Sequence, residues 1–391
     1  MTTLAAQDLP ALVAPGPELT REETVRYSRH LILPGFGVQA QRRLKNARVL
    51  VVGAGGLGSP ILLYLAAAGV GRIGIVDDDT VEESNLQRQV VHGMADVGRT
   101  KAESARAAVL DLNPLVQVDL HPVRLDADNA LDILAGYDLV LDGADNFATR
   151  YLVSDAAEIL GMPCVWGSIL RFDGQVSVFW SGHGPTYRDL YPQAPPPGEV
   201  PSCAEGGVLG VLCAQIGSVM ANEAIKLITG TGTTLLGRLL VFDALEMSWR
   251  EIRVRRDPAR TRVTELADYE AFCGIAPQPG ADLPEVTVEQ LNALLAERAA
   301  GRADFDLLDV REPDERAIVS IDGATPAPRG TVLAGQFQPA RDRRIYVHCK
   351  SGARSAEVVR HLLEQGYAQV WNVSGGILDW VRRIEPEKPA Y

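Results

Sequence analysis

The stretch RVLVVGAGGLGSPILLYLAAAGVGRIGIVDDD, residues 48–79, decides the fold of the first part of this chain. Residues 48–52 form a short continuous apolar run, which is typical of a buried parallel strand. A glycine-rich turn follows, then an apolar helical segment over residues 60–68, and then a second apolar run over residues 72–76 that ends at Asp77. A strand, a glycine-rich turn, a helix and a second strand in this order predict a βαβ unit of a parallel sheet.

The turn contains the pattern GxGxxG, in which Gly53, Gly55, Gly56 and Gly58 are the glycines. Glycines let the backbone approach a phosphate closely, and the N-terminus of the following helix offers free N–H groups and a positive dipole. The alternative is a tight turn without a ligand. Asp77 at the end of the second strand is placed to accept hydrogen bonds from ribose hydroxyls, so a nucleotide such as NAD is the first hypothesis.

The charges that follow the second strand favour a nucleoside triphosphate over NAD. Arg88 and Lys101 are cations, and three consecutive aspartates precede them at residues 77–79. A dinucleotide needs few side-chain cations, whereas a triphosphate needs several cations and an acid that holds magnesium. A dehydrogenase is therefore the weaker hypothesis for this domain.

The remaining pattern predicts two α/β domains with a linker between them. Strands are expected at 139–141, 164–166, 175–180 and 239–242, with a helix over 210–228. Residues 1–17 look like a disordered tail, and a helix over 18–33 begins with a capping box made by Thr20 and Glu23. We expect a Rossmann-like ATP-binding domain over residues 18–273.

Residues 274–284, GIAPQPGADLP, are the expected linker, and the pattern restarts after them. Helices are expected at 288–297 and 355–364, and strands at 305–309, 344–348 and 369–372. Residues 285–391 therefore form a second, smaller α/β domain.

Composition narrows the classes of protein. The chain has 391 residues, 46% of them hydrophobic and 23% charged, which is ordinary for a globular protein. Its formal net charge of -12 argues against nucleic acid or an anionic membrane as a general partner. The N-terminus lacks the pattern of a secretory signal, and the longest apolar stretch, 61–70, is too short to cross a bilayer. We therefore expect a cytoplasmic protein.

The sequence has 5 cysteines, none in a CxxC pair, so a disulfide framework is not expected. The individual thiols are Cys164, Cys203, Cys213, Cys273 and Cys349.

Together, GAGGLG at 53–58, DDDTVEESNLQRQ at 77–89, Lys101 and DGADN at 142–146 resemble the MoeB/ThiF adenylyltransferases, which are related to the ubiquitin-activating enzymes. The resemblance runs from about Arg21 to Phe272. It implies that the enzyme binds ATP and Mg²⁺. It also implies that the C-terminal Gly-Gly carboxylate of a small ubiquitin-like carrier protein attacks the α-phosphate, which gives an acyl-adenylate and pyrophosphate.

The resemblance also implies roles for single residues. The glycine loop lines the ATP, Asp77 holds the ribose, and Asp145 coordinates magnesium. The residues expected to contact the phosphates are Asn85, Arg88 and Lys101.

Two further residues are carried over with an alternative each. Arg29 matches an arginine that reaches into the neighbouring subunit's pocket, which implies a homodimer; the alternative is an exposed charge on an amphipathic helix. Cys203 matches a cysteine that bonds covalently to the carrier in some members; the alternative is a small residue in a loop.

The chain departs from the family at a structural zinc site. The family often holds zinc with two CxxC pairs, and here Thr186 and Asp189 stand where the first pair would be. The second pair is also missing from residues 255–263. We expect no zinc.

A second candidate site begins at Cys349, in CKSGARS at 349–355, between a predicted strand and a predicted helix. Backbone N–H groups at a helix N-terminus and the nearby Arg354, which would close the loop, favour the thiolate. The alternative is an ordinary buried thiol.

Residues 286–391 resemble rhodanese domains, which carry sulfur as a cysteine persulfide. DVR at 309–311 and SGGILDW at 374–380 support the resemblance, whereas residues 318–329 lack the usual His-Ile-Pro signature. A cysteine phosphatase is the rival, but the loop between Cys349 and Arg354 is shorter than the phosphatase pattern C-x5-R and suits a sulfur atom better.

The two resemblances imply an enzyme that adenylates a sulfur carrier and then converts the adenylate into a thiocarboxylate. The sulfur donor would be thiosulfate or a cysteine desulfurase. Molybdopterin, thiamine, cysteine and tRNA thiolation pathways remain open. The rivals are an NAD-dependent dehydrogenase with an appended rhodanese and a non-catalytic scaffold, whose site residues would be expected to be lost.

Overall fold

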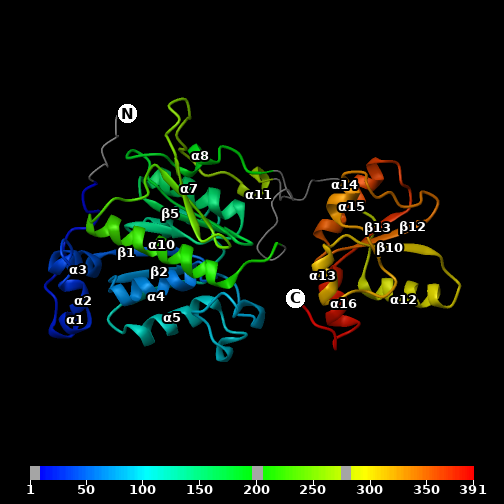
Figure 1. Ribbon diagram of the computed structural model, residues 1–391, viewed down its shortest axis with the longest axis horizontal. Helices are drawn as coiled ribbons and strands as arrows, with labels where there is room; N and C mark the ends of the chain where they lie inside the picture. Colours follow the sequence, from blue (N-terminus) through cyan, green and yellow to red (C-terminus); the bar gives the residue numbers. More distant parts are fainter. Residues whose placement is uncertain (1–8, 196–205, 274–282) are drawn as a thin grey trace. The chain divides into compact units, whose positions relative to one another are not determined.

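The computed structural model describes residues 9–195, 206–273 and 283–391. The chain divides into two compact units, Met1–Ala276 and Pro277–Tyr391, and the division falls in the stretch predicted as the linker. Each unit has its own sheet and its own hydrophobic cores (Figure 1). Cys203 lies outside the described residues.

The first unit is built on an eight-stranded sheet in the order β3-β2-β1-β4-β5-β6-β7-β8. The pairs from β3 to β5 are parallel, and the pairs from β5 to β8 are antiparallel. The strands are β1 (Arg48–Val52), β2 (Arg72–Val76), β3 (Gln117–His121), β4 (Leu139–Asp142), β5 (Cys164–Leu170), β6 (Asp173–Phe179), β7 (Arg238–Asp243) and β8 (Ser248–Arg253). The predicted βαβ unit is confirmed.

Helices cover both faces of this sheet because successive side chains of β1 point to opposite faces. Val49 and Val51 belong to the core under one helical layer, and Leu50 and Val52 belong to the core under the other. The first layer contains α3 (Gly37–Asn46), α4 (Gly58–Ala68), α5 (Lys101–Leu112) and α10 (Gly210–Thr229). The second contains α6 (Ala130–Leu134), α7 (Phe147–Leu160), α8 (Tyr187–Leu190) and α11 (Tyr269–Phe272).

Helix α10 is long and apolar enough to cross a membrane by length and composition alone. In this structure it packs against α4 and β5, and residues such as Leu212, Ile216 and Met220 are fully buried in the core. Its apolar character is therefore explained by its place in the interior of the first unit.

The N-terminal region differs from the prediction in two respects. Residues 9–17 are not a free tail, because the N–H of Leu12 donates to the carbonyl of Leu227 (2.9 Å) and Val13 is buried. The predicted helix over 18–33 keeps its capping box but breaks at Tyr27 into α1 (Arg21–Arg26) and α2 (Ser28–Leu31). Tyr27 is buried, and its hydroxyl accepts a hydrogen bond from Asn113 (2.9 Å), which ties the break to the core.

The glycine-rich turn joins β1 to α4 by close backbone packing. A Cβ on Gly58 would lie 1.9 Å from the carbonyl oxygen of Gly53, and a Cβ on Gly56 would lie 2.8 Å from Cys213 Sγ. Gly53 has φ +88°, which favours glycine. At Gly55 the nearest atom to an added Cβ would be Gln89 Nε2, at 3.6 Å. Packing therefore requires Gly58, whereas the surroundings of Gly55 leave room beside the backbone.

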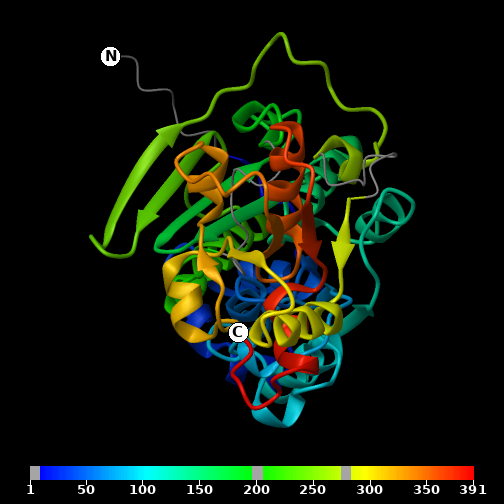
Figure 2. The same cartoon turned by 90° about the vertical axis from the view of Figure 1, so that its right-hand side faces the viewer.

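The segment where the zinc-binding pairs would lie is held by ion pairs. Both the N–H and the hydroxyl of Thr186 donate to Asp189 (2.6 and 3.1 Å), whose other carboxylate oxygen accepts from Arg260 (3.3 Å). Arg260 also forms a bidentate pair with the buried Glu158 (2.8 and 3.1 Å). These contacts attach the long connection from β8 to α11, visible in Figure 2, to α7 and α8.

The second unit has a five-stranded parallel sheet in the order β11-β10-β12-β13-β9. The strands are β9 (Glu285–Val286), β10 (Phe305–Asp309), β11 (Thr325–Pro326), β12 (Arg344–His348) and β13 (Val370–Val373). Helices α14 (Arg329–Leu333) and α15 (Ala353–Glu364) share one core, and α12 (Val288–Ala299) and α16 (Gly376–Arg383) share the other. Helix α13 (Pro313–Ile318) follows β10. The predicted smaller α/β domain is confirmed.

Gly58→Ala should destabilise the first unit, because the new Cβ would overlap the Gly53 carbonyl. Gly55→Ala should leave the unfolding transition nearly unchanged, because the new Cβ would make only an ordinary van der Waals contact with Gln89 (3.6 Å). Chemical denaturation followed by circular dichroism would measure both, and we expect Gly58→Ala to lose about 2 kcal/mol or more of unfolding free energy. Equal stability of the two variants would contradict this account of the turn.

Arg260→Ala should lower the free energy of unfolding by about 3 kcal/mol, because Glu158 would remain buried without its partner. Arg256→Ala, which removes an exposed charge in the same connection, is the matched control and should change the free energy of unfolding by less than about 0.5 kcal/mol.

Elemental analysis of the wild type should give far less than one zinc per chain. A stoichiometric, chelator-resistant zinc would show that other ligands hold the metal.

Candidate active sites

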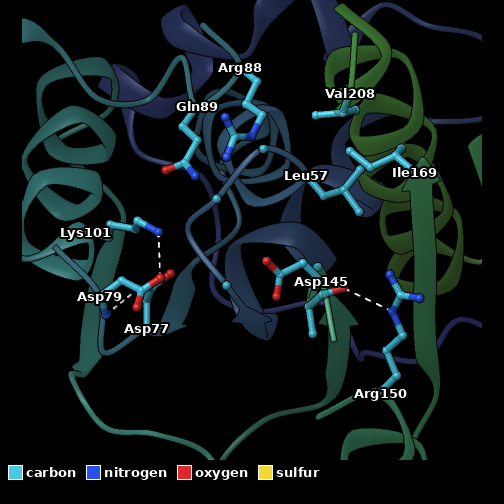
Figure 3. Close-up of a pocket in the computed structure, with 15 residues that line it drawn as sticks. Leu57, Asp77, Asp79, Arg88, Gln89, Lys101, Asp145, Arg150, Ile169 and Val208 are labelled. Carbon is cyan, nitrogen blue, oxygen red and sulfur yellow. Dashed lines mark hydrogen bonds and ion pairs between the residues drawn. The ribbon is translucent and has the colours of Figure 1, made fainter. Parts of the chain in front are cut away.

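A pocket in the first unit lies where β1, β2 and β4 end. After β1 the chain continues into α4 on one face of the sheet, and after β4 it continues into α7 on the other face. A crevice therefore opens at the carboxyl ends of these neighbouring strands. The residues that line the pocket are Gly53, Gly55, Gly56, Leu57, Asp77, Asp79, Arg88, Gln89, Lys101, Gly143, Ala144, Asp145, Arg150, Ile169 and Val208 (Figure 3).

The peptide groups around Ala54 in the glycine turn are held by two side chains. The N–H of Ala54 donates to Asp77 (2.8 Å), and its carbonyl accepts from Nε2 of His92 (3.0 Å). The pKa of His92 is lowered by burial, so the ring stays neutral, and its Nδ1 faces the hydroxyl of Ser104 (2.7 Å). Asp77, whose pKa is raised by burial, therefore shapes the turn as well as facing the pocket.

Cations line the pocket on the side of β2 and the segment that follows it. Lys101 begins α5, and its ammonium donates to Asp79 (2.8 Å). Arg88 donates to the carbonyl of Ser84 (3.1 Å), and Figure 3 shows its guanidinium in the upper part of the pocket beside Gln89. Two cations thus face the glycine turn, where phosphate groups would approach the backbone.

Acidic groups follow β4 at the centre of the pocket. Asp142 is buried, and burial raises its pKa to about 6, although the N–H of Ala144 donates to it (3.0 Å). Asp145 is exposed to the pocket, and among the described residues no hydrogen bond or ion pair engages its carboxylate. Arg150 in α7 donates through Nε to the carbonyl of Ala144 (3.2 Å) and fixes the turn that carries Asp145 (Figure 3).

The structure brings most of the predicted nucleotide residues together. Those that line the pocket are Gly53, Gly55, Gly56, Asp77, Arg88, Lys101 and Asp145. Three predicted residues do not line it. Gly58 serves the packing of the turn, the amide oxygen of Asn85 caps its own short helix by accepting from the N–H of Glu82 (3.1 Å), and Arg29 is exposed on α2.

Sequence reasoning missed four residues of this site: Asp79, Gln89, His92 and Arg150. Asp79 and Gln89 lie inside the quoted motif, and their chemistry could have suggested them. His92 and Arg150 act through single backbone carbonyls, and sequence patterns do not reveal such contacts.

The donor set suits a nucleoside triphosphate. The open backbone at Gly55, the cations Arg88 and Lys101, and the acceptor Asp77 match phosphates and a ribose. Among the described residues no cluster of three or more His, Cys, Asp or Glu forms a ready-made metal site. Magnesium is commonly held by one or two carboxylates together with substrate phosphates and water, so Asp145 fits as a ligand.

The second candidate site lies in the second unit, at the end of its central strand β12. Cys349 is buried, its Sγ accepts from the N–H of Gly352 (3.1 Å), and the hydroxyl of Ser355 lies 3.4 Å from it. Gly352 has φ +104° and begins the turn into α15. The sulfur thus lies between a strand and a helix N-terminus, as the sequence predicted, with one backbone N–H and one hydroxyl beside it.

The loop is supported by the glycine pair that precedes α16. The N–H groups of Ile377 and Leu378 donate to the carbonyls of Cys349 and Lys350 (2.9 and 3.1 Å). A Cβ on Gly376 would lie 2.5 Å from the carbonyl oxygen of Lys350. The SGGILDW motif therefore positions the cysteine loop by close backbone contact.

Arg354 forms a bidentate pair with Glu315, with both distances 2.7 Å. Glu315 lies in α13, which follows β10, the neighbour of β12 in the sheet. The sequence analysis predicted that Arg354 closes the loop around the sulfur. It did not include Glu315, because no sequence pattern links these two residues.

A buried ion pair lies at the ends of the same two strands. Arg311 donates to Asp309 (2.7 and 2.9 Å), and both side chains are fully buried. His348, which precedes the cysteine, lies 3.6 Å from Asp309, and burial lowers the pKa of its ring to about 4. The DVR motif thus anchors the carboxyl edge of the sheet, and the imidazole beside Cys349 is neutral at physiological pH.

Comparison with known proteins identifies both units. Residues 27–263 match the ThiF family, and residues 287–383 match the rhodanese-like domain. A probable adenylyltransferase/sulfurtransferase MoeZ from Mycobacterium tuberculosis is 56% identical over 392 residues, which covers 98% of this chain and 99% of that protein. The adenylyltransferase and sulfurtransferase MOCS3 of Drosophila ananassae is 41% identical and covers 96% of this chain and 87% of its own length.

Two further similarities concern a single unit. A sulfur carrier protein adenylyltransferase from Thermus thermophilus is 56% identical over 267 residues, which is 66% of this chain and 98% of that protein. A crystal structure of Escherichia coli MccB has a TM-score of 0.56 at 22% identity over 62% of this chain and 75% of its own, which shows the shared fold. The chain belongs to the ThiF family, carries a rhodanese-like domain after it, and is an adenylyltransferase and sulfurtransferase.

Proposed function

We propose that the first unit uses ATP to adenylate the C-terminal Gly-Gly carboxylate of a small ubiquitin-like sulfur-carrier protein. The observation that carries this proposal is the pocket in which the glycine turn, two cations and a free carboxylate meet. The Thermus thermophilus relative supports the carrier as substrate, because it is named for this activity and corresponds to 66% of this chain. The carboxylate of the carrier would attack the α-phosphate and expel pyrophosphate.

The residues of the pocket have separate roles in the adenylation step. Lys101 and Arg88 would neutralise the charge that develops on the departing pyrophosphate. Asp77 would accept from the ribose, and Asp145 would hold Mg²⁺, which screens the charge of the phosphates when it is bound. Among the described residues that line the pocket, none forms an acid–base pair suited to hydride transfer, so NAD-dependent oxidation has no support from this geometry.

The second unit supplies sulfur in this proposal. The Cys349 persulfide attacks the carbonyl of the acyl-adenylate, AMP leaves, and an acyl disulfide with Cys349 results. A further thiol then attacks Cys349 Sγ, which releases the carrier thiocarboxylate and leaves a disulfide that cellular thiols reduce. Thiosulfate or a cysteine desulfurase would reload the cysteine. A non-catalytic scaffold is disfavoured because Arg88, Lys101, Asp145, Cys349 and Arg354 are all retained.

We also propose a cytoplasmic homodimer in which Arg29 serves the partner subunit. Arg29 is exposed and does not line the pocket of its own chain, which fits a role in trans. Exposed apolar side chains occur in the same N-terminal region, at Val25 in α1, Ile32 just after α2 and Val38 in α3. Such a surface suits a contact with a second copy.

Asp145→Ala should abolish the exchange of labelled pyrophosphate into ATP in the presence of magnesium and a carrier ending in Gly-Gly, because the metal loses its protein ligand. Loss of at least 100-fold is expected for a group of this kind. Asp138→Ala, which removes a partly exposed carboxylate that pairs with Arg48 outside the pocket, is the control and should keep the exchange. Undiminished exchange in Asp145→Ala would remove this residue from the site.

Mixing Arg29→Ala protein with Lys101→Ala protein should restore part of the exchange activity, because a mixed dimer contains one pocket with both residues intact. Each variant alone should be nearly inactive. Light scattering that gives a monomer at working concentration would contradict the dimer. Failure of the mixture to recover activity, with subunit exchange demonstrated, would contradict the role of Arg29 in trans.

Cys349→Ala should abolish sulfur transfer and thiocarboxylate formation while leaving pyrophosphate exchange almost unchanged, because the two sites belong to different units. Intact-mass analysis after incubation with a sulfur donor should show one added sulfur atom on the wild type alone. Exchange by the same variant is the internal control. If Cys349→Ala still gained the sulfur, Cys203 would become the better candidate.

A further inference from the structure

The guanidinium of Arg354 in the cysteine loop is occupied by a carboxylate. Its two terminal nitrogens donate to the two carboxylate oxygens of Glu315, each at 2.7 Å. Only 14% of the Arg354 side chain and 10% of the Glu315 side chain are exposed. A bidentate pair of this kind, largely removed from water, is among the stronger side-chain contacts. Arg354, which would otherwise bind an anionic sulfur donor, is therefore already paired with a carboxylate of the protein.

Two more groups donate hydrogen bonds to the Glu315 carboxylate. The N–H of Glu312 donates to it (3.0 Å), and so does the hydroxyl of Tyr391 (2.9 Å), which itself accepts from Arg311 (2.8 Å). The ammonium of Lys350, next to the reactive cysteine, lies 4.6 Å from the centre of the Tyr391 ring. Burial raises the pKa of Glu315, but the hydrogen bonds from Arg354 and the Glu312 N–H outweigh it, so the carboxyl is ionised at neutral pH.

Two arginines near the loop are thus each paired with a carboxylate. Arg311 is neutralised by Asp309, and Arg354 is neutralised by Glu315. A donor that carries two negative charges, such as thiosulfate, would have to approach the fixed carboxylate of Glu315 or displace it from Arg354. A thiosulfate in contact with Arg354 would also lie close to this carboxylate, and like charges in close proximity repel appreciably even near a protein surface.

We infer that Glu315 is a specificity-determining residue that disfavours thiosulfate and selects a cysteine persulfide as the sulfur donor. This inference rests on the proposed role of Cys349. With a persulfide donor, the Cys349 thiolate attacks the outer sulfur, the donor S–S bond breaks, and the donor cysteine leaves as a thiolate. With thiosulfate, the same attack expels sulfite. Neither reaction needs an oxidant or a reductant, and only the second brings a dianion beside Glu315.

The pair with Glu315 also gives Arg354 a positioning role that requires no contact with a persulfide donor. Arg354 is the second residue of α15, and Gly352 and Ser355, which contact Cys349 Sγ, flank it in the chain. Held by Glu315, Arg354 fixes the turn that carries these donors. The loop then stabilises the negative charge on sulfur through its own N–H groups.

The test compares two donors on the full-length protein. The rate constant for adding one sulfur atom to Cys349 is measured by quenched intact-mass analysis, with thiosulfate and with cysteine persulfide. In Glu315→Gln the thiosulfate rate constant should rise about 10-fold, since one negative charge is removed and the shape is kept. The persulfide rate constant should change by less than about 3-fold, since that donor does not require Arg354.

The matched control is Glu357→Gln, which neutralises a carboxylate on the same helix that pairs with Arg329 (2.7 and 2.9 Å). It should leave both rate constants unchanged. Tyr391→Phe removes one hydrogen bond to Glu315 and should raise only the thiosulfate rate, by less than Glu315→Gln does.

Three outcomes would overturn the inference: an unchanged or lower thiosulfate rate in a folded Glu315→Gln protein, an equal gain in Glu357→Gln, or a wild type that uses thiosulfate as fast as cysteine persulfide. The last comparison decides the matter even if the variants do not fold. A wild type whose Cys349 takes sulfur from neither donor contradicts the proposed role of Cys349 instead.

Discussion

The contact between Gly58 and the carbonyl of Gly53 is the constraint on which the first unit depends. It brings the first turn of α4 against the end of β1 so closely that no side chain fits between them. The N-terminus of α4 therefore points into the crevice at the carboxyl ends of β1 and β4. Asp77 and His92 hold the peptide groups of Ala54 between them, and the backbone of Gly55 lines the pocket where a ligand would lie. The nucleotide pocket is a consequence of this packing.

The second unit also places a reactive group between a parallel strand and a helix, and a different glycine contact positions it. Cys349 also stands between a parallel strand and a helix, and Gly376 allows α16 to approach the loop backbone. In both units a reactive group is placed at the carboxyl edge of a sheet, where N–H groups at a helix N-terminus face it. The first edge is arranged for the phosphates of a nucleotide and the second for a single sulfur atom.

The two edges differ in how they balance charge. In the first unit Asp145 faces the pocket without a partner among the described residues, and Lys101 is held by the well-exposed Asp79. In the second unit Arg311 and Arg354 are each matched by a largely buried carboxylate. The first site is thus suited to a highly charged substrate together with a metal, and the second to a donor that brings little charge.

The sequence by itself determined the βαβ unit, the parallel sheets, the division near the linker, and seven of the 15 residues that line the nucleotide pocket. These features follow from local patterns: apolar runs of strand length, a glycine turn with fixed spacing, and a cysteine before a helix. Only the tertiary structure decided that Arg354 faces Glu315, that Arg150 and His92 support the turns of the first site, and that residues 9–17 pack against the first unit. The physical reason is that these are individual hydrogen bonds and ion pairs, most of them between segments that are distant in the chain, and such contacts leave no periodic trace in a sequence.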